Sequence, residues 1–198
     1  GRVSALLTDH RMLVNAARYL SGAGAGGSLP TKDQGWGEVA LKGFLTASRF
    51  AKDQTYVFGD GGQSFVTTGL INDSSQPVKV ALAWTDAPGP TVGAAFVNDL
   101  DLEVTAGGVL YRGNHFAGAF SAAGGAADPA NNVEAVFLPA GTSGNVEIQV
   151  KATTIAGDGI PGNADPTDQD FALSVLNVVE SPVPVLTGFL TDDEKARG

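Results

Sequence analysis

The chain of 198 residues contains no cysteine, which excludes a disulfide framework, a thiolate zinc site and a cysteine nucleophile. It has only two histidines, His10 and His115. Neither has the neighbouring sequence of a serine-protease triad, and the two are not spaced as the paired ligands of a zinc protease. We therefore expect stability to come from a core and bound ions, and no catalysis by this chain alone.

Basic residues and long apolar runs are also scarce. The chain has 12 Lys and Arg against 21 Asp and Glu, with a formal charge of −9, so nucleic acid is not an expected partner. No apolar run approaches membrane-spanning length, and the N-terminus lacks a signal-peptide pattern. Because the chain starts at Gly1 without an initiator Met, we interpret it as part of a longer protein, with any export signal upstream. A composition with 27 Gly and no Cys is common among exported bacterial proteins.

The first twenty residues show apolar positions at helical spacing, which predicts a helix or helix pair over 3–20. If its apolar face is uncovered, we expect self-association through Leu6, Leu13 and Leu20 or docking on the rest of the chain. The segment 21–28, SGAGAGGS, follows this helix and lacks the Lys-Ser/Thr pair of a phosphate-binding loop, so we interpret it as a linker.

From Gln63 onward the apolar period changes to two, and turn residues separate the apolar segments. Seven or eight strands without intervening helices predict a mainly β fold, an antiparallel β-sandwich or jelly roll of about eight strands. The predicted strands are 64–71, 78–84, 99–105, 109–112, 133–138, 145–154 and 171–178. The long connections 113–132 and 156–170 exceed ordinary hairpin loops, and such loops are usually functional, ion-ordered or disordered.

Carboxylates gather after the predicted strand that ends at Trp84. Asp86 follows this strand, and Asp99, Asp101 and Glu103 then alternate with apolar residues, so the last three share one strand face. Such carboxylates repel unless they are hydrated or share a cation. The pattern therefore fits either a solvated face or a calcium site, and both interpretations stay open.

The loop AGDGIPGNADPTDQD is a second acidic segment. Its acids include Asp158, Asp165 and Asp168, but their spacing is not that of an EF-hand. A flexible acidic loop and a second ion site are both compatible with it.

The motif PAGTSGN holds the best candidate nucleophile, Ser143. Gly-Thr-Ser opens the active-site helix of subtilisin-like proteases, but here Gly144 and Asn145 follow and lead into a predicted strand. A hairpin turn is therefore the better interpretation.

Several segments resemble, in order, one family of proteases. QGWGEVAL at 34–41, preceded by VNAARYL, resembles the end of a subtilisin-like serine protease catalytic domain. The later segments resemble the jelly-roll β-sandwich, related to the P domain of proprotein convertases, that follows this domain in a group of secreted bacterial subtilases. The resemblance covers about 13–177 and implies a catalytic-domain end over 1–50, a sandwich over 51–180 and a linker over 181–198. The later segments are VALAWTDAPGP, FVNDLDLEVTAGG, YRGN, NNVEAVFLPAGTSG and DQDFALSVLN.

The resemblance implies a secreted, extracellular, non-catalytic region. In this family the catalytic residues lie upstream of the last helix, so none is expected here. The sandwich packs on the catalytic domain of the same polypeptide, stabilises it, and in some members binds calcium. A protein substrate is then a partner of the whole enzyme. The expected calcium ligands in the matching segments are Asp86, Asp99, Asp101, Asn132 and Glu134.

Two other functions fit the sequence. A sandwich with exposed aromatics would bind carbohydrate or protein substrate, and Trp36, Trp84 and Tyr111 are its candidate contacts, although the strand context of Trp84 favours a core position. An independent hydrolase that uses the acidic cluster is the third hypothesis.

Overall fold

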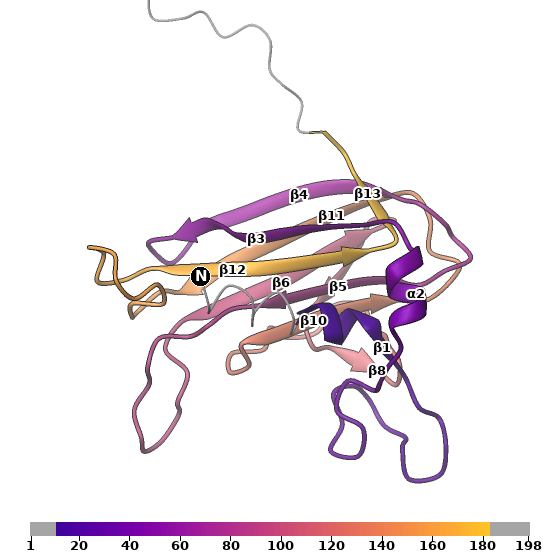
Figure 1. Ribbon diagram of the computed structural model, residues 1–198, viewed down its shortest axis with the longest axis horizontal. Coiled ribbons are helices and arrows are strands. Elements are labelled where there is room, and N and C mark those ends of the chain that lie inside the picture. Colours follow the sequence, from indigo (N-terminus) through magenta and orange to yellow (C-terminus); the bar gives the residue numbers. More distant parts are fainter. Residues whose placement is uncertain (1–10, 183–198) are drawn as a thin grey trace, which may run out of the picture.

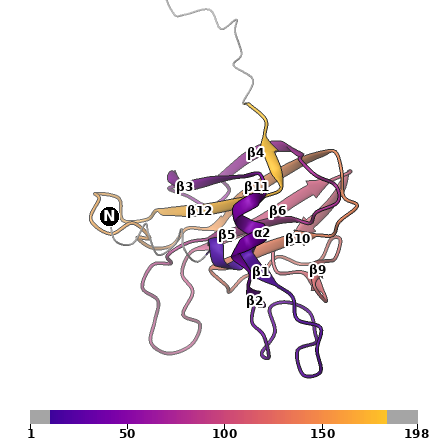
Figure 2. The same cartoon turned by 45° about the vertical axis from the view of Figure 1, so that its right-hand side comes forward.

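A computed structural model describes residues 11–182, and two antiparallel sheets form its body (Figures 1 and 2). The predicted mainly β fold, an antiparallel β-sandwich of about eight strands, is confirmed. The four-stranded sheet has the order β10 (Val133–Leu138), β5 (Val78–Ala83), β12 (Gln169–Leu176) and β3 (Arg49–Phe58). The five-stranded sheet has the order β13 (Val178–Glu180), β4 (Ser64–Ile71), β11 (Asn145–Thr154), β6 (Asp99–Ala106) and β7 (Val109–Arg112).

The core lies between the two sheets, where alternate residues of each strand meet. Leu100, Leu102 and Val104 of β6 point inward and are fully buried, as their alternation with polar residues predicts. They belong to the same cluster as Leu82 and Leu173 of the opposite sheet. Removal of this apolar surface from water is the main force that holds the sheets together.

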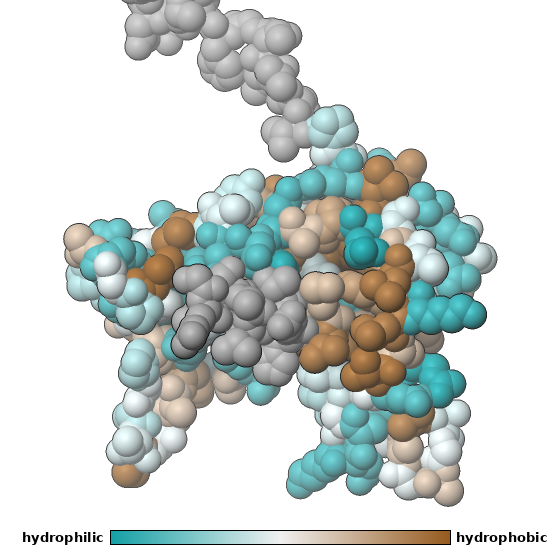
Figure 3. Space-filling view, in the orientation of Figure 1, coloured by the Kyte–Doolittle hydropathy of each residue, from teal (hydrophilic) through white to brown (hydrophobic). Residues whose placement is uncertain are grey.

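The segment 11–46, which we call the N-terminal segment, contacts the four-stranded sheet. Residues 11–16 are helical, β1 (Ala17–Arg18) pairs with β2 (Glu38–Val39), and α2 (Leu41–Thr46) follows. Figures 1 and 2 show β1 and α2 together beside the sandwich. Hydrophobic surface gathers around α2 in Figure 3, where exposed apolar side chains include Leu41 and Leu45.

The predicted helix over 3–20 is wrong beyond residue 16, because Ala17 and Arg18 pair with β2 as a strand. Residues 1–10, with Leu6, lie outside the described residues, as does most of the expected linker over 181–198. The helical face that packs on the sheet also differs from the apolar face that was expected. Leu13 is exposed, whereas Arg11 and Asn15 are buried because they donate hydrogen bonds to the sheet.

Most predicted strands are found within two residues, but the predicted strand 171–178 is two strands. Asn177 has a φ of 65°, a left-handed conformation in which Asn is enriched, and the chain there passes from one sheet to the other. Strand β3 was not predicted. It lies at a sheet edge, and its middle is polar. Its pairing with β12 is irregular between Asp53 and Val57, where Gln54 has a φ of 51°. A small hairpin of β8 (Phe116–Ala117) and β9 (Phe120–Ser121) lies in the long loop 113–132.

Leu102→Ala should show how much the core contributes. Leu102 is fully buried, so the substitution removes apolar contacts and leaves a cavity. We expect the free energy of unfolding in urea to fall by about 2 to 5 kcal/mol. Val92→Ala is the control, because the exposed Val92 should change stability by less than about 0.5 kcal/mol. Equal losses in the two variants would contradict the packing described.

Candidate functional site

The carboxylate of Glu134 connects the two sheets at one end of the sandwich. β7 pairs with β6 only from Glu103 onward, so the backbone of Leu102 is free to bond elsewhere. The N–H of Leu102 donates to Glu134 Oε2 at 2.7 Å, and the Leu102 carbonyl accepts from the N–H of Gly113 at 2.8 Å. A Cβ at position 113 would meet Glu134 Oε2 at 2.1 Å, so only glycine allows this approach.

Two carboxylate oxygens beside this contact are buried and have no hydrogen-bond partner among the described residues. They are Glu134 Oε1 and Asp101 Oδ1, on side chains whose residues are 1% and 8% exposed. The other oxygen of Asp101 accepts a hydrogen bond from Thr153 Oγ1. A buried, unpaired carboxylate oxygen is costly, so each would gain from a cation or a hydrogen-bond donor placed beside it.

Burial and mutual repulsion raise the pKa of two carboxyls. Burial raises the pKa of Asp99 to about 6, and the charges of Asp101, Asp128 and Asp86 add to the shift. Burial also raises the pKa of Glu134 to about 9, with further contributions from Asp101, Asp128 and Asp99. Five carboxyls at this end of the sandwich therefore act on one another electrostatically, and we call them the acidic cluster.

Two of the predicted ligands also hold the surrounding loops. Asp86 accepts hydrogen bonds from the N–H groups of Val97 and Asn98, both at 2.8 Å. Asn132 donates from Nδ2 to the carbonyl of Trp84 at 3.0 Å. The amide oxygen of Asn132 is not used in that bond, so the side chain can still offer an oxygen ligand.

Asp128 belongs to the acidic cluster but was not predicted from the sequence. Burial acts to raise its pKa, but hydrogen bonds from Asn114, Asn131 and the Ala130 N–H outweigh that effect and lower it. Asn114 Nδ2 donates to Asp128 Oδ2 at 2.6 Å. The signal in the sequence was the polar run DPANN at the end of a loop that is otherwise rich in Ala and Gly.

Other acids of the sequence are used elsewhere. Glu103, on the same strand as Asp101, accepts from Arg112 at 3.2 Å and from Lys151 at 2.6 Å. In the loop 156–170, Asp168 is buried and accepts hydrogen bonds from Ile160 N–H and Asn163 Nδ2. These bonds hold the loop in place, so the carboxylate of Asp168 is already satisfied within its own loop.

The three candidate aromatics do not form an exposed platform. Trp84 is buried, as its strand context predicted, and its Nε1 lies 3.3 Å from the Asn98 carbonyl. Trp36 packs on Phe137, with the ring centroids 6.2 Å apart. Tyr111 is partly buried against the main core.

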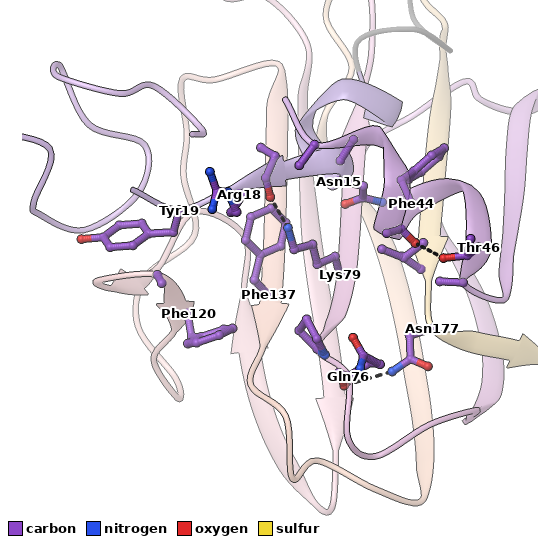
Figure 4. A pocket seen from close by; sticks show the side chains of 18 of the residues that line it. Asn15, Arg18, Tyr19, Phe44, Thr46, Gln76, Lys79, Phe120, Phe137 and Asn177 are labelled. Atoms are coloured by element: carbon purple, nitrogen blue, oxygen red, sulfur yellow. Dashed lines mark hydrogen bonds between the residues drawn. The ribbon is translucent and has the colours of Figure 1, made fainter. Parts of the chain in front are cut away.

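A cavity of about 810 Å³ separates part of the N-terminal segment from the four-stranded sheet (Figure 4). Lys79 of β5 enters it, donates from Nζ to the Ala17 carbonyl, and lies 4.7 Å from the centroid of the Phe137 ring. Burial lowers the pKa of Lys79 to about 8. The cation therefore joins the end of the helical residues 11–16 to the sheet, where the charge suits the exposed carbonyls of a helix C-terminus.

The candidate catalytic groups lie in hairpin or loop structure. Ser143 follows Thr142, whose hydroxyl donates to the Pro139 carbonyl at 2.7 Å in the turn before β11. His115 Nδ1 lies 3.1 Å from the Ala122 carbonyl, and His10 is outside the described residues.

Within residues 11–182, no group of three or more acidic or histidine side chains is placed so that it could hold a metal ion. No helix among these residues is long and apolar enough to cross a membrane. No protein-family model matches the chain, and no curated protein matches it.

The raised pKa of Glu134 predicts a pH dependence for the protein in EGTA. A carboxyl that holds its proton more tightly when folded stabilises the fold at low pH, and this contribution is lost as pH rises from about 4.5 to about 9. We expect the melting temperature to fall over that range, and Glu134→Gln to flatten the profile because its amide is neutral. Glu147→Gln, on the exposed face of β11, should leave the slope unchanged. A wild-type slope kept by Glu134→Gln would contradict the assignment.

Proposed function

We propose that this chain is a non-catalytic accessory domain of a secreted bacterial subtilisin-like serine protease, and that it stabilises the protease domain. The resemblance in the sequence supports this proposal, because several separate segments match in order. The fold adds support, since these segments form β5, β6 and β10 and contribute Asp86, Asp101 and Glu134 to one end of the sandwich.

The observation that carries the proposal is the buried polar attachment of the helical residues 11–16. Arg11 Nη1 donates to the Leu173 carbonyl at 2.7 Å, and Asn15 Nδ2 donates to the Ser174 carbonyl at 2.9 Å. Lys79 bonds the Ala17 carbonyl from the sheet side. Buried polar contacts require precise geometry, so a catalytic domain that ends in this helix would be fixed to the sandwich rather than loosely tethered.

The exposed apolar surface of the N-terminal segment is the proposed contact with the catalytic domain of the same polypeptide. Leu13, Val39, Leu41 and Leu45 are between 44% and 60% exposed. Large apolar side chains exposed together often mark an interaction site. In the proposed enzyme, this surface would adjoin the catalytic domain because residues 11–46 resemble its end.

We also propose that the acidic cluster binds calcium. Asp101 and Glu134 each offer a buried oxygen that has no partner in the described part of the chain, and the carboxyls of Asp86, Asp99 and Asp128 act on them. Asn132, two residues before Glu134, adds an amide oxygen. Calcium accepts six to eight oxygen ligands in flexible geometry and would supply the positive charge that this cluster lacks. Since no group of these side chains is preplaced for a metal, binding requires the carboxylates to move toward one another.

A substrate- or carbohydrate-binding module is the alternative function. This function would need exposed aromatic side chains that contact the ligand. Trp84 is buried, and Trp36 packs against Phe137, so neither forms such a contact. The structure therefore favours the accessory role over this alternative.

Calcium should stabilise the full chain. At about one hundred times its dissociation constant, calcium adds about 2.7 kcal/mol, which corresponds to a rise of about 5 to 10 °C in melting temperature. We expect no such rise with magnesium, or in Asp101→Asn and Glu134→Gln. Asp60→Asn, at an exposed turn, should keep the full response. A rise of equal size in Asp101→Asn would show that any calcium binds elsewhere.

Asn15→Ala tests the attachment of the helical residues 11–16. Loss of the bonds to Ser174 should lower the free energy of unfolding of this chain by about 1 to 3 kcal/mol, measured in urea. In the longer protease, the same change should shorten the half-life of activity on heating. Arg18→Ala is the control on the same segment, since it breaks an exposed ion pair with Glu38 that contributes at most about 1 kcal/mol. An unchanged half-life in Asn15→Ala would argue against stabilisation of the catalytic domain through this contact.

A further inference from the structure

The cavity beside Lys79 contains a cation for which residues 11–182 supply no counter-ion. Lys79 Nζ donates to the Ala17 carbonyl, which is its only hydrogen-bond acceptor in the described part of the chain. None of these residues forms an ion pair with it. A lysine ammonium has three N–H donors, so the donors that Ala17 does not use have no acceptor among the same residues. A part-buried ammonium in this state would gain from an anion placed beside it.

The other charged side chains on the described cavity wall are exposed and bond elsewhere. Asp73 accepts hydrogen bonds at Oδ1 from the N–H and the hydroxyl of Ser75, both within its own turn. The guanidinium of Arg18 pairs with Glu38 at the exposed surface. Lys79 is therefore the one part-buried charge on this wall, and it is positive.

Aromatic side chains line the cavity next to Lys79. The Phe137 ring is buried, and its centroid lies 4.7 Å from Lys79 Nζ, as Figure 4 shows. Trp36 packs on this ring and also lines the cavity. Phe120, on the small hairpin of β8 and β9, is a further lining residue and is 37% exposed. These rings offer a ligand an apolar surface close to the cation.

The size and charge of the cavity select a class of ligand. A volume of about 810 Å³ is typical of small-molecule sites, which are mostly apolar with a few polar groups that orient the ligand. The charge of Lys79 disfavours a cationic ligand. A phosphate dianion would leave part of its charge without compensation, whereas one ammonium matches one carboxylate. The chemistry that fits best is therefore a carboxylate attached to an apolar body.

We propose that the cavity beside Lys79 binds a small organic carboxylate with an apolar body. The carboxylate accepts hydrogen bonds from Lys79 Nζ, and the apolar body packs on Phe137 and Phe120. Burial lowers the pKa of Lys79 to about 8, as expected for an ammonium that lacks an anionic partner. Fatty acids and the C-terminal carboxylate of an apolar peptide share this chemistry. The proposal is independent of the protease and calcium proposals.

Titration of the full chain with octanoate, followed by amide chemical shifts in NMR, tests the site. We expect saturable shifts at Ala17 and Phe120 and none at Gly93, which does not line the cavity. Octanamide keeps the apolar body without the charge, so it should bind at least about tenfold more weakly. N-acetylphenylalanine, which resembles the end of a peptide, is the second carboxylate probe. Whichever acid binds more tightly assigns the site to fatty acids or to peptide ends.

Lys79→Met tests the role of the cation, because methionine keeps an apolar stem without the charge. We expect octanoate to bind about tenfold more weakly to this variant, with octanamide unchanged. Lys32→Met is the matched control, since Lys32 is exposed and does not line the cavity. An unchanged amide shift of the core residue Val150 shows that each variant folds.

Three results would overturn the proposal. Absence of saturable shifts with both acids would show that the cavity takes no apolar carboxylate. Equal affinity of the wild-type chain for octanoate and octanamide would exclude a contact between the ligand's charge and Lys79. Equal loss of affinity for both probes in Lys79→Met would show an effect on the shape of the cavity rather than on its charge.

Discussion

The buried hydrogen bond from the Leu102 N–H to Glu134 is the constraint on which the acidic end of the sandwich depends. It requires β7 to pair only with the second half of β6, so that one edge of the first half is open to Glu134, and it requires glycine at position 113. It also places a carboxylate from the four-stranded sheet beside Asp101 of the five-stranded sheet. Because the surroundings are apolar and acidic, this carboxyl is neutral unless a cation accompanies it. The same contact therefore joins the sheets and places a titratable carboxyl between them.

The N-terminal segment is attached by a different kind of interaction. Apolar contacts of Val14 and Phe44 contribute, but Arg11, Asn15 and Lys79 fix its position through bonds to backbone carbonyls. Apolar side chains can stay in contact while the segment shifts along the sheet. Each of these hydrogen bonds, in contrast, forms only when its donor and acceptor are correctly placed. The segment is therefore oriented on the sheet as well as bound to it.

The sequence predicted the sandwich well because strand alternation and turn residues are local signals. The strands from Ser64 to Thr154 were recovered since their inward residues are apolar at every second position. Strand β3 was not predicted, because it lies at a sheet edge and its polar middle does not show this alternation. The helical prediction over 3–20 failed beyond residue 16 because pairing of Ala17 with Val39 overrode a helical spacing.

The candidate site was predictable only in part. Asp99 and Asp101 carry a signal in their alternation, and Glu134 came from the family resemblance. Asp128 approaches them through the fold of a long loop, which local patterns do not encode. Likewise, nothing in the sequence shows that both oxygens of Asp86 accept hydrogen bonds from the N–H groups of Val97 and Asn98. Asp86 therefore stabilises this loop as well as adding a negative charge.

The position of Glu134 suggests how an ion at the acidic end would act on the attached N-terminal segment. Glu134 lies on β10, which pairs along its whole length with β5, and β5 carries Lys79. Lys79 lies opposite Phe137 of β10 in the same register and bonds the Ala17 carbonyl. Only one pair of hydrogen-bonded strands therefore separates the acidic cluster from the end of the helical residues 11–16. An ion that rigidifies β10 would raise the free energy needed to separate the N-terminal segment from the sheet, because both depend on the same pairing of β10 with β5.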